Sequence, residues 1–116
     1  MKALPLMIAT AACQSAPVPD ESIAACSVTV RFGSYAMGID TAAAARIEAL
    51  LAENRDSRKV SREGGGREGE YALCVSAADA AGAARLVTAI TALLPERPRG
   101  PISVEGAGRK VEAPAP

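Results

Sequence analysis

The fold of this chain is most constrained by the order of two patterns of apolar residues, one with the period of a strand and one with the period of a helix. Apolar and polar residues alternate over residues 26–32, which is the pattern of a strand with one buried face. Apolar residues then recur at helical spacing over 41–54, after a capping residue at Asp40 or Thr41. Further strands are predicted over 58–62, 70–75 and 102–105. A second helix begins after Ser76 or Asp79 and ends at Pro95. The glycines around Ala107 allow one more strand over 109–112.

This order, βαββαβ, resembles the ferredoxin-like fold. The resemblance implies an α+β sandwich in which two helices lie on one face of a four-stranded antiparallel sheet of order 4-1-3-2. Strand polarity agrees, because 26–32 and 70–75 are apolar enough for the centre, whereas 58–62 carries basic residues that protect an edge. The alternative is two helices on one face of a three-stranded sheet.

The core of this domain is expected to be thin. Hydrophobic residues make up 49% of the 116-residue chain, but alanine supplies nearly half of them. Basic and acidic residues, 13 of each, cancel, which favours a small globule over a disordered chain. There is no histidine, which excludes Ser-His-Asp and Cys-His catalysis and histidine-ligated zinc. A non-catalytic protein is therefore the main prediction.

The first residues indicate export. A basic start at Lys2 and an uncharged, mostly apolar run form the pattern of a signal over residues 1–12 that is too short to span a bilayer. Residues 10–13, Thr-Ala-Ala-Cys, resemble the lipobox of bacterial lipoprotein precursors. The resemblance implies that Cys13 is lipidated and tethers the protein to the periplasmic side of a membrane. Cleavage after residues 9–11 (Ala-Thr-Ala) would instead release a soluble periplasmic protein.

The rest of the chain divides accordingly into a disordered spacer (13–25), one folded domain (26–112) and a disordered tail (113–116). Lipidation of Cys13 would leave Cys26 and Cys74 as a pair, and export would place that pair where disulfides persist. Alternation puts the two cysteines on opposite faces of the sheet. A bridge then requires that Cys26 precede the strand proper or that a bulge intervene; two unpaired buried thiols are the alternative.

The loop over residues 33–38 is the candidate binding site. It presents Ser34, Tyr35 and Met37 between two glycines, and Arg31 on the preceding strand faces away from the core. We favour the interpretation that Tyr35 and Met37 fold down as a lid over the sheet end. Two alternatives are a binding loop and an enzyme subunit that uses this loop with Arg31 and Tyr71.

No cofactor, metal or nucleic acid is predicted. Glycines in the pattern GxGxxG at 64–69 precede a strand instead of opening a helix, so they indicate a hairpin loop and not a phosphate site. The basic residues of 55–67 are interleaved with acidic ones and lack aromatic partners. The cysteine spacing is not a zinc pattern. The prediction is a small envelope lipoprotein with a non-catalytic binding or structural domain, or a soluble periplasmic binding or inhibitor module.

Overall fold

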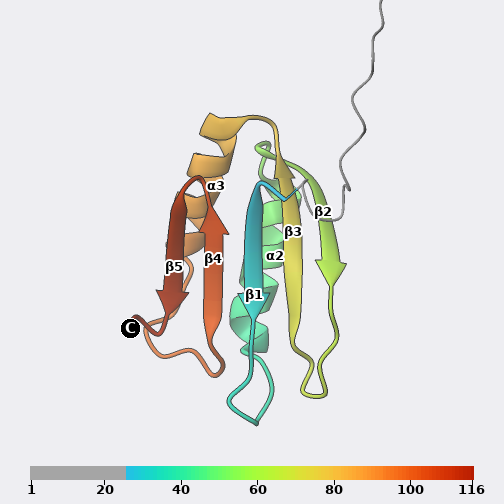
Figure 1. Cartoon of the computed structure of the whole chain (residues 1–116), viewed down its shortest axis with the longest axis vertical. Coiled ribbons are helices and arrows are strands. Elements are labelled where there is room, and N and C mark those ends of the chain that lie inside the picture. Colours follow the sequence, from blue (N-terminus) through green and yellow to red (C-terminus); the bar gives the residue numbers. More distant parts are fainter. Residues whose placement is uncertain (1–25) are drawn as a thin grey trace, which may run out of the picture.

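The structure, a computed structural model, describes residues 26–116 (Figure 1). The predicted export signal, Cys13 and the spacer up to residue 25 lie outside the described residues. The elements in chain order are β1 (Val28–Phe32), α2 (Thr41–Glu53), β2 (Ser57–Glu63), β3 (Tyr71–Ala77), α3 (Ala80–Thr91), β4 (Ile102–Gly106) and β5 (Arg109–Ala113).

The strands form one antiparallel sheet of order β2-β3-β1-β4-β5. The apolar strands β1 and β3 lie inside it, and the basic strand β2 is an edge. The predicted α+β class is confirmed. The predicted four-stranded layout is met only in part, because β5 adds a fifth strand beyond β4.

A two-residue turn produces the extra strand. Ala107 and Gly108 both have positive φ values, 53° and 75°, as the tight turns of antiparallel hairpins require. Gly106 then pairs with Arg109, and β5 continues to Ala113, which is buried. Ala113, the first residue of the predicted tail, therefore belongs to β5.

Both helices lie on the same face of the sheet, behind the strands in Figure 1. The register explains which side chains they cover, because Val28 pairs with Val75 and Val30 with both Leu73 and Val104. These residues point toward the helices and meet the helical residues that recur at the predicted spacing. The core comprises Val28, Val30, Phe32, Ala43, Ala44, Ile47, Leu51, Leu73, Val75, Ala83, Leu86, Val87, Ile90, Ile102 and Val104.

Side-chain caps begin both helices. The carboxylate of Asp40 accepts a hydrogen bond from the Ala43 N–H, and that of Asp79 accepts one from the Gly82 N–H. Neither helix in residues 26–116 has the length and apolarity that crossing a bilayer would take.

Candidate functional site

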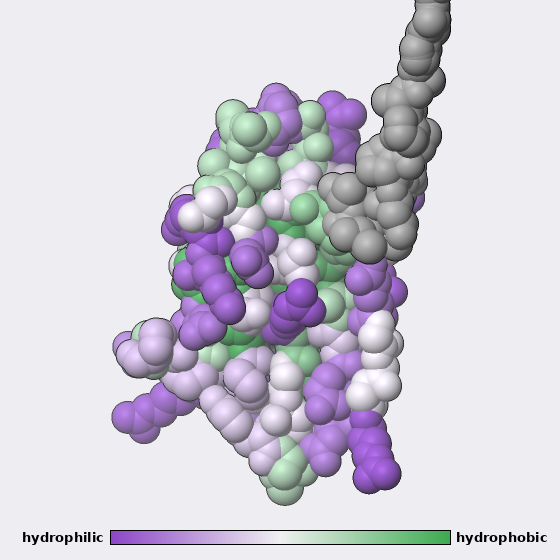
Figure 2. All heavy atoms as spheres, viewed as in Figure 1, coloured by the Kyte–Doolittle hydropathy of each residue, from purple (hydrophilic) through white to green (hydrophobic). Residues whose placement is uncertain are grey.

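One face of the sheet carries no helix and holds Arg31 at its centre. This uncovered face is formed by the alternate residues Thr29, Arg31, Ala72, Cys74 and Ser103, whose chain neighbours point into the core. Hydrophilic, pale and apolar areas alternate over it in Figure 2. It is therefore a mixed surface rather than one continuous apolar patch.

Arg31 is a cation between small neighbours. The register places Ala72 on one side of it and Ser103 on the other, and the next residues outward are Glu63 and Glu112. Those carboxylates belong to strands about 10 Å from β1. No ion pair within residues 26–116 includes Arg31. The guanidinium can therefore meet an anionic group of a ligand or partner.

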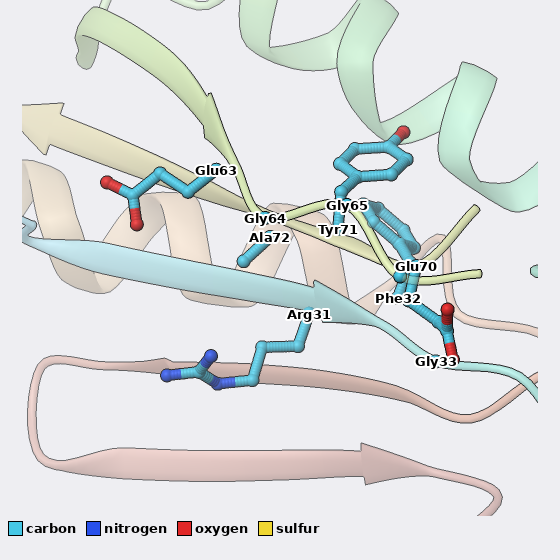
Figure 3. A pocket seen from close by; sticks show the side chains of 10 residues that line it. Arg31, Phe32, Gly33, Glu63, Gly64, Gly65, Glu70, Tyr71 and Ala72 are labelled. Carbon is cyan, nitrogen blue, oxygen red and sulfur yellow. The ribbon is translucent and has the colours of Figure 1, made fainter. Parts of the chain in front are cut away.

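Two hollows flank Arg31. One, of about 470 Å³, extends toward the glycine-rich turn between β2 and β3 (Figure 3). The other, of about 360 Å³, lies toward β4 and is lined by Tyr35, Pro101 and Pro114. The structure therefore brings the predicted residues Arg31 and Tyr35 to one hollow.

The loop between β1 and α2 is held by Ser34. Its Oγ accepts hydrogen bonds from the N–H groups of Ala36 (2.8 Å) and Gly38 (2.9 Å). It also donates one to the Glu68 carboxylate at 2.8 Å, which joins the loop to the β2–β3 hairpin. Ala36 has φ 112°, a strained value for a residue with a side chain, and these bonds hold it there.

The apolar side chains of this loop point outward. Tyr35 is 57% exposed and Met37 is 91% exposed, so the interpretation of the two residues as a lid over the sheet end is wrong. The physical reason is the turn around Ser34, whose hydroxyl bonds to Ala36, Gly38 and Glu68 and so directs the intervening side chains away from the core. Met37 borders a third hollow, of about 650 Å³, on the other side of the loop.

A partly exposed network of side chains that the sequence pattern did not indicate lines this third hollow. The Tyr71 hydroxyl donates to the Glu48 carboxylate, which also accepts from Arg62 at 3.1 Å, and the Arg62 guanidinium lies 3.8 Å from the Tyr71 ring centre. Burial, followed by the hydrogen bond to Glu48 and its charge, raises the pKa of Tyr71 to about 12, although Arg62 acts in the opposite direction.

Tyr71 and Arg31 both line the hollow of about 470 Å³, but they extend from opposite faces of the sheet. Tyr71 pairs with Phe32, on the core side of β1, whereas Arg31 pairs with Ala72 on the uncovered face. In Figure 3 the Tyr71 ring points toward α2 and the Arg31 side chain lies on the other side of the sheet. The arrangement around Arg31 can bind a charged group of a ligand or partner.

The disulfide joins the start of β1 to β3. Cys26 and Cys74 are bridged, with their Cα atoms 5.0 Å apart. Cys74 lies on the uncovered face, and Cys26 precedes the first residue of β1, Val28. Alternation predicted that the two cysteines lie on opposite faces of the sheet. They can nevertheless be bridged, because a residue outside the strand need not follow its alternation.

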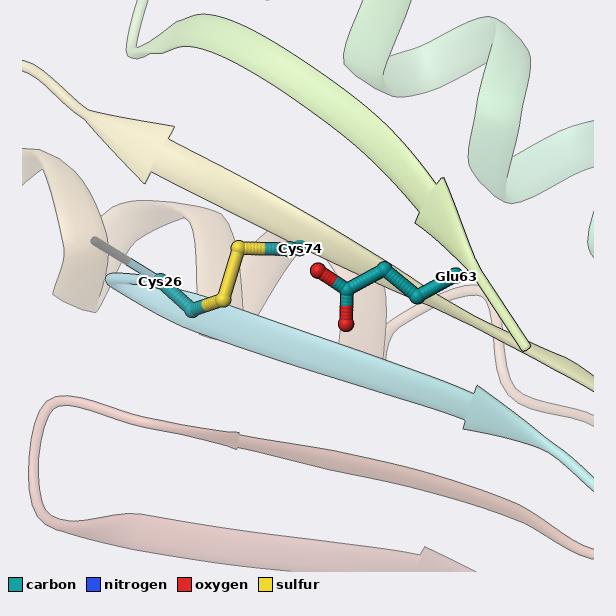
Figure 4. A group of neighbouring side chains, drawn as sticks. All are labelled: Cys26, Glu63 and Cys74. Atoms are coloured by element: carbon teal, nitrogen blue, oxygen red, sulfur yellow. A yellow bond between two sulfur atoms is a disulfide. The ribbon is translucent and has the colours of Figure 1, made fainter. Parts of the chain in front are cut away.

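Glu63 lies beside the disulfide, which the sequence did not indicate. A carboxylate oxygen of Glu63 and the two sulfur atoms lie within 4.8 Å of one another (Figure 4). The register is the cause, because Ser61 pairs with Cys74 and Glu63 follows two residues later on the same face. Only knowledge of that strand pairing could have found this group.

The comparisons with known proteins offer no relative for this site. No family model matches the chain, and neither a curated protein nor a solved structure matches it.

Proposed function

We propose that this chain is a small bacterial envelope lipoprotein, tethered through Cys13, whose folded domain binds a partner and performs no chemistry of its own. The domain is a ferredoxin-like sandwich extended by β5. The neighbour order β2-β3-β1-β4 is the order expected of a ferredoxin-like sheet, and β5 is added beyond β4. The pairing of Cys26 with Cys74 supports export, because disulfides persist in oxidising compartments.

The observation that carries the binding role is the position of the loop over residues 33–38. This loop and the β2–β3 hairpin lie at one end of the sheet, and β1 begins at the other end (Figure 1). A tether that enters at Cys26 would leave Tyr35 and Met37 at the end of the domain opposite the point of attachment. A large apolar side chain that is 91% exposed on a hydrogen-bonded loop is suited to insert into a partner protein.

The tether is tested by intact mass. The full chain is produced in a bacterium that processes lipoproteins and is extracted from the membrane fraction. Its intact mass is measured by mass spectrometry beside that of the Cys13→Ser variant. We expect a wild-type protein that begins at Cys13 and carries a diacylglyceryl group, and a variant that lacks it. A wild-type protein without lipid that begins elsewhere would contradict the tether and favour the soluble periplasmic module.

The binding role is tested by crosslinking in the same cells. A photoreactive residue at position 37 should capture one partner, whereas the same residue at position 110, toward the other end of the sheet, should not. Tyr35→Ala should abolish the crosslink and change the free energy of unfolding by less than about 0.5 kcal/mol, since the side chain is exposed. Equal crosslinking from positions 37 and 110 would contradict the proposal.

A further inference from the structure

The Cys26–Cys74 pair and Glu63 form the one group of potential metal ligands that converge within residues 26–116. We propose that, once the disulfide is reduced by a dithiol, Cys26, Cys74 and Glu63 bind a zinc ion, so that the disulfide and the zinc complex are alternative states of one site. This inference does not depend on the tether or on the binding loop.

The spacing of the three side chains suits zinc. Zinc takes thiolate and carboxylate ligands in tetrahedral geometry, with neighbouring ligand atoms roughly 3.5–3.8 Å apart. The two sulfurs and the Glu63 oxygen already lie within 4.8 Å of one another. Breaking the sulfur–sulfur bond lets the two sulfurs separate to van der Waals contact, which is close to the separation that a tetrahedral site requires.

The backbone around Cys26 keeps the site assembled after reduction. The Ser27 N–H donates to the carbonyl of Val75 at 2.7 Å, and the Ser27 hydroxyl accepts from the Ala77 N–H at 2.9 Å. These two bonds hold the residue after Cys26 against β3 without help from the disulfide. Cys26 itself lies outside the regular strand, so its side chain can adjust to an ion.

Glu63 is available as the third ligand. No hydrogen bond or ion pair in the described part of the chain engages its carboxylate, and Figure 4 shows that it points toward the two sulfurs. Cys74 is rigidly placed because β3 is paired on both sides. Three protein ligands leave one position of the tetrahedron open to water or to a further ligand.

The two states interconvert by balanced steps. A dithiol transfers two electrons and two protons to the Cys26–Cys74 bond, which becomes two thiols while the dithiol becomes a cyclic disulfide. Zinc then replaces the two thiol protons, which leave to solvent, and accepts an oxygen of Glu63. Removal of two electrons from the thiolates by a disulfide oxidant reforms the Cys26–Cys74 bond and releases the ion.

The test measures zinc binding to the reduced and the oxidised chain. The full chain is made in a Cys13→Ser background, so that two cysteines remain, and is reduced with dithiothreitol that is then removed without oxygen. Zinc affinity is measured by competition with a chromophoric chelator, and cobalt serves as a spectroscopic probe of thiolate ligation. We expect one ion per reduced chain, cobalt–thiolate absorption, and no binding to the oxidised chain.

Matched variants identify the third ligand. Glu63→Gln should weaken zinc binding by about tenfold or more. Even residues that only hydrogen-bond to a metal ligand change metal affinity by about tenfold or more, and Glu63 is proposed to bind the ion directly. Glu105→Gln removes the same charge from the uncovered face, two strands from Cys74, and should leave the affinity unchanged. The proposal would be overturned if Glu63→Gln bound zinc as tightly as wild type, or if the oxidised chain bound zinc as tightly as the reduced chain.

A folding readout separates this site from thiols of an unfolded chain. Amide NMR spectra are recorded for the reduced protein before and after zinc. Dispersed spectra with zinc bound, whether or not the zinc-free reduced chain is folded, support the proposal. The proposal would be overturned if the chain bound zinc while its amide spectrum stayed poorly dispersed, or if it bound no zinc at all.

Discussion

At the scale of single residues, Asp40 joins two distant parts of the chain. One carboxylate oxygen accepts from the Ala43 N–H at 3.0 Å and caps α2, and the other accepts from the Arg99 N–H at 2.9 Å. Burial raises the pKa of Asp40, but these two hydrogen bonds and the charges of Arg46 and Arg99 outweigh burial and hold the pKa below its usual 3.8.

Replacing Asp40 should destabilise the domain. Asp40→Ala removes both acceptors, and we expect the free energy of unfolding to fall by about 2 kcal/mol. Asp40→Asn keeps one oxygen for the helix cap and should lose less. Urea unfolding followed by circular dichroism measures both, and equal stability of Asp40→Ala and wild type would contradict the double role.

The same carboxylate predicts acid sensitivity. Because the folded pKa of Asp40 is lowered, its contribution is present above the unfolded value near 3.8 and disappears as the pH falls through the folded value. The stability difference between wild type and Asp40→Asn should therefore shrink below about pH 4. A difference that is constant from pH 7 to pH 2 would be inconsistent with this titration.

Tyr71 predicts the opposite behaviour in alkali. Its pKa of about 12 means that the neutral phenol is favoured in the folded state, so this contribution is present below pH 10 and is lost as the pH rises through about 12. In a Tyr35→Phe protein, tyrosinate absorbance should rise near pH 12. Adding Glu48→Gln should lower the midpoint, because it removes the hydrogen-bonded carboxylate whose charge favours the neutral phenol. An unchanged midpoint would show that Glu48 has no effect.

At the scale of elements, the β4–β5 hairpin is where the fold departs from its predicted layout. Gly106 ends β4 and pairs with Val28 on one side and Arg109 on the other. A Cβ atom at Gly106 would lie 2.6 Å from the Ser27 carbonyl oxygen and 3.1 Å from the Val28 Cα atom. The glycine is needed because the backbones at this end of β1 and β4 leave no room for a side chain.

A substitution tests this close approach. Gly106→Ala should lower the free energy of unfolding by about 1–3 kcal/mol through overpacking against backbone that cannot move aside. Gly65→Ala, in the β2–β3 hairpin turn, is the control, because a Cβ atom added there would meet no other part of residues 26–116 within 4 Å. Thermal unfolding compares the two, and equal melting temperatures would contradict the steric argument.

At the scale of the whole molecule, the disulfide compensates for a small core. The core is built from seven branched or aromatic strand residues and from helical residues of which three are alanine. The bridge joins positions 48 residues apart, so it restricts a large part of the unfolded chain.

Removing the bridge should therefore be costly. In the chain-entropy model, Cys26→Ala with Cys74→Ala should lower the free energy of unfolding by about 4 kcal/mol. Guanidinium unfolding measures the change. Dithiothreitol should shift the wild-type curve toward that of the double variant and leave the double variant unchanged. A reductant-insensitive wild type would mean that the bridge contributes nothing to stability.

The sequence by itself determined the order of the elements, the buried faces of β1, β3 and both helices, and a cap for α2 at Asp40 or Thr41, of which the structure has Asp40. Each of these follows from a local period or from a side chain that bonds to backbone within a few residues. Arg31 was placed on the open side of β1 for the same reason.

Only the tertiary structure decided which side chains meet. Glu63 lies beside the disulfide, and Glu48 reaches Tyr71 and Arg62, because strand register and helix placement bring together residues far apart in the chain. The exposure of Met37 depends on Ser34, whose hydroxyl bonds to Glu68 across 34 positions. Such contacts leave no period in the sequence, since they depend on how whole elements pack rather than on what lies nearby along the chain.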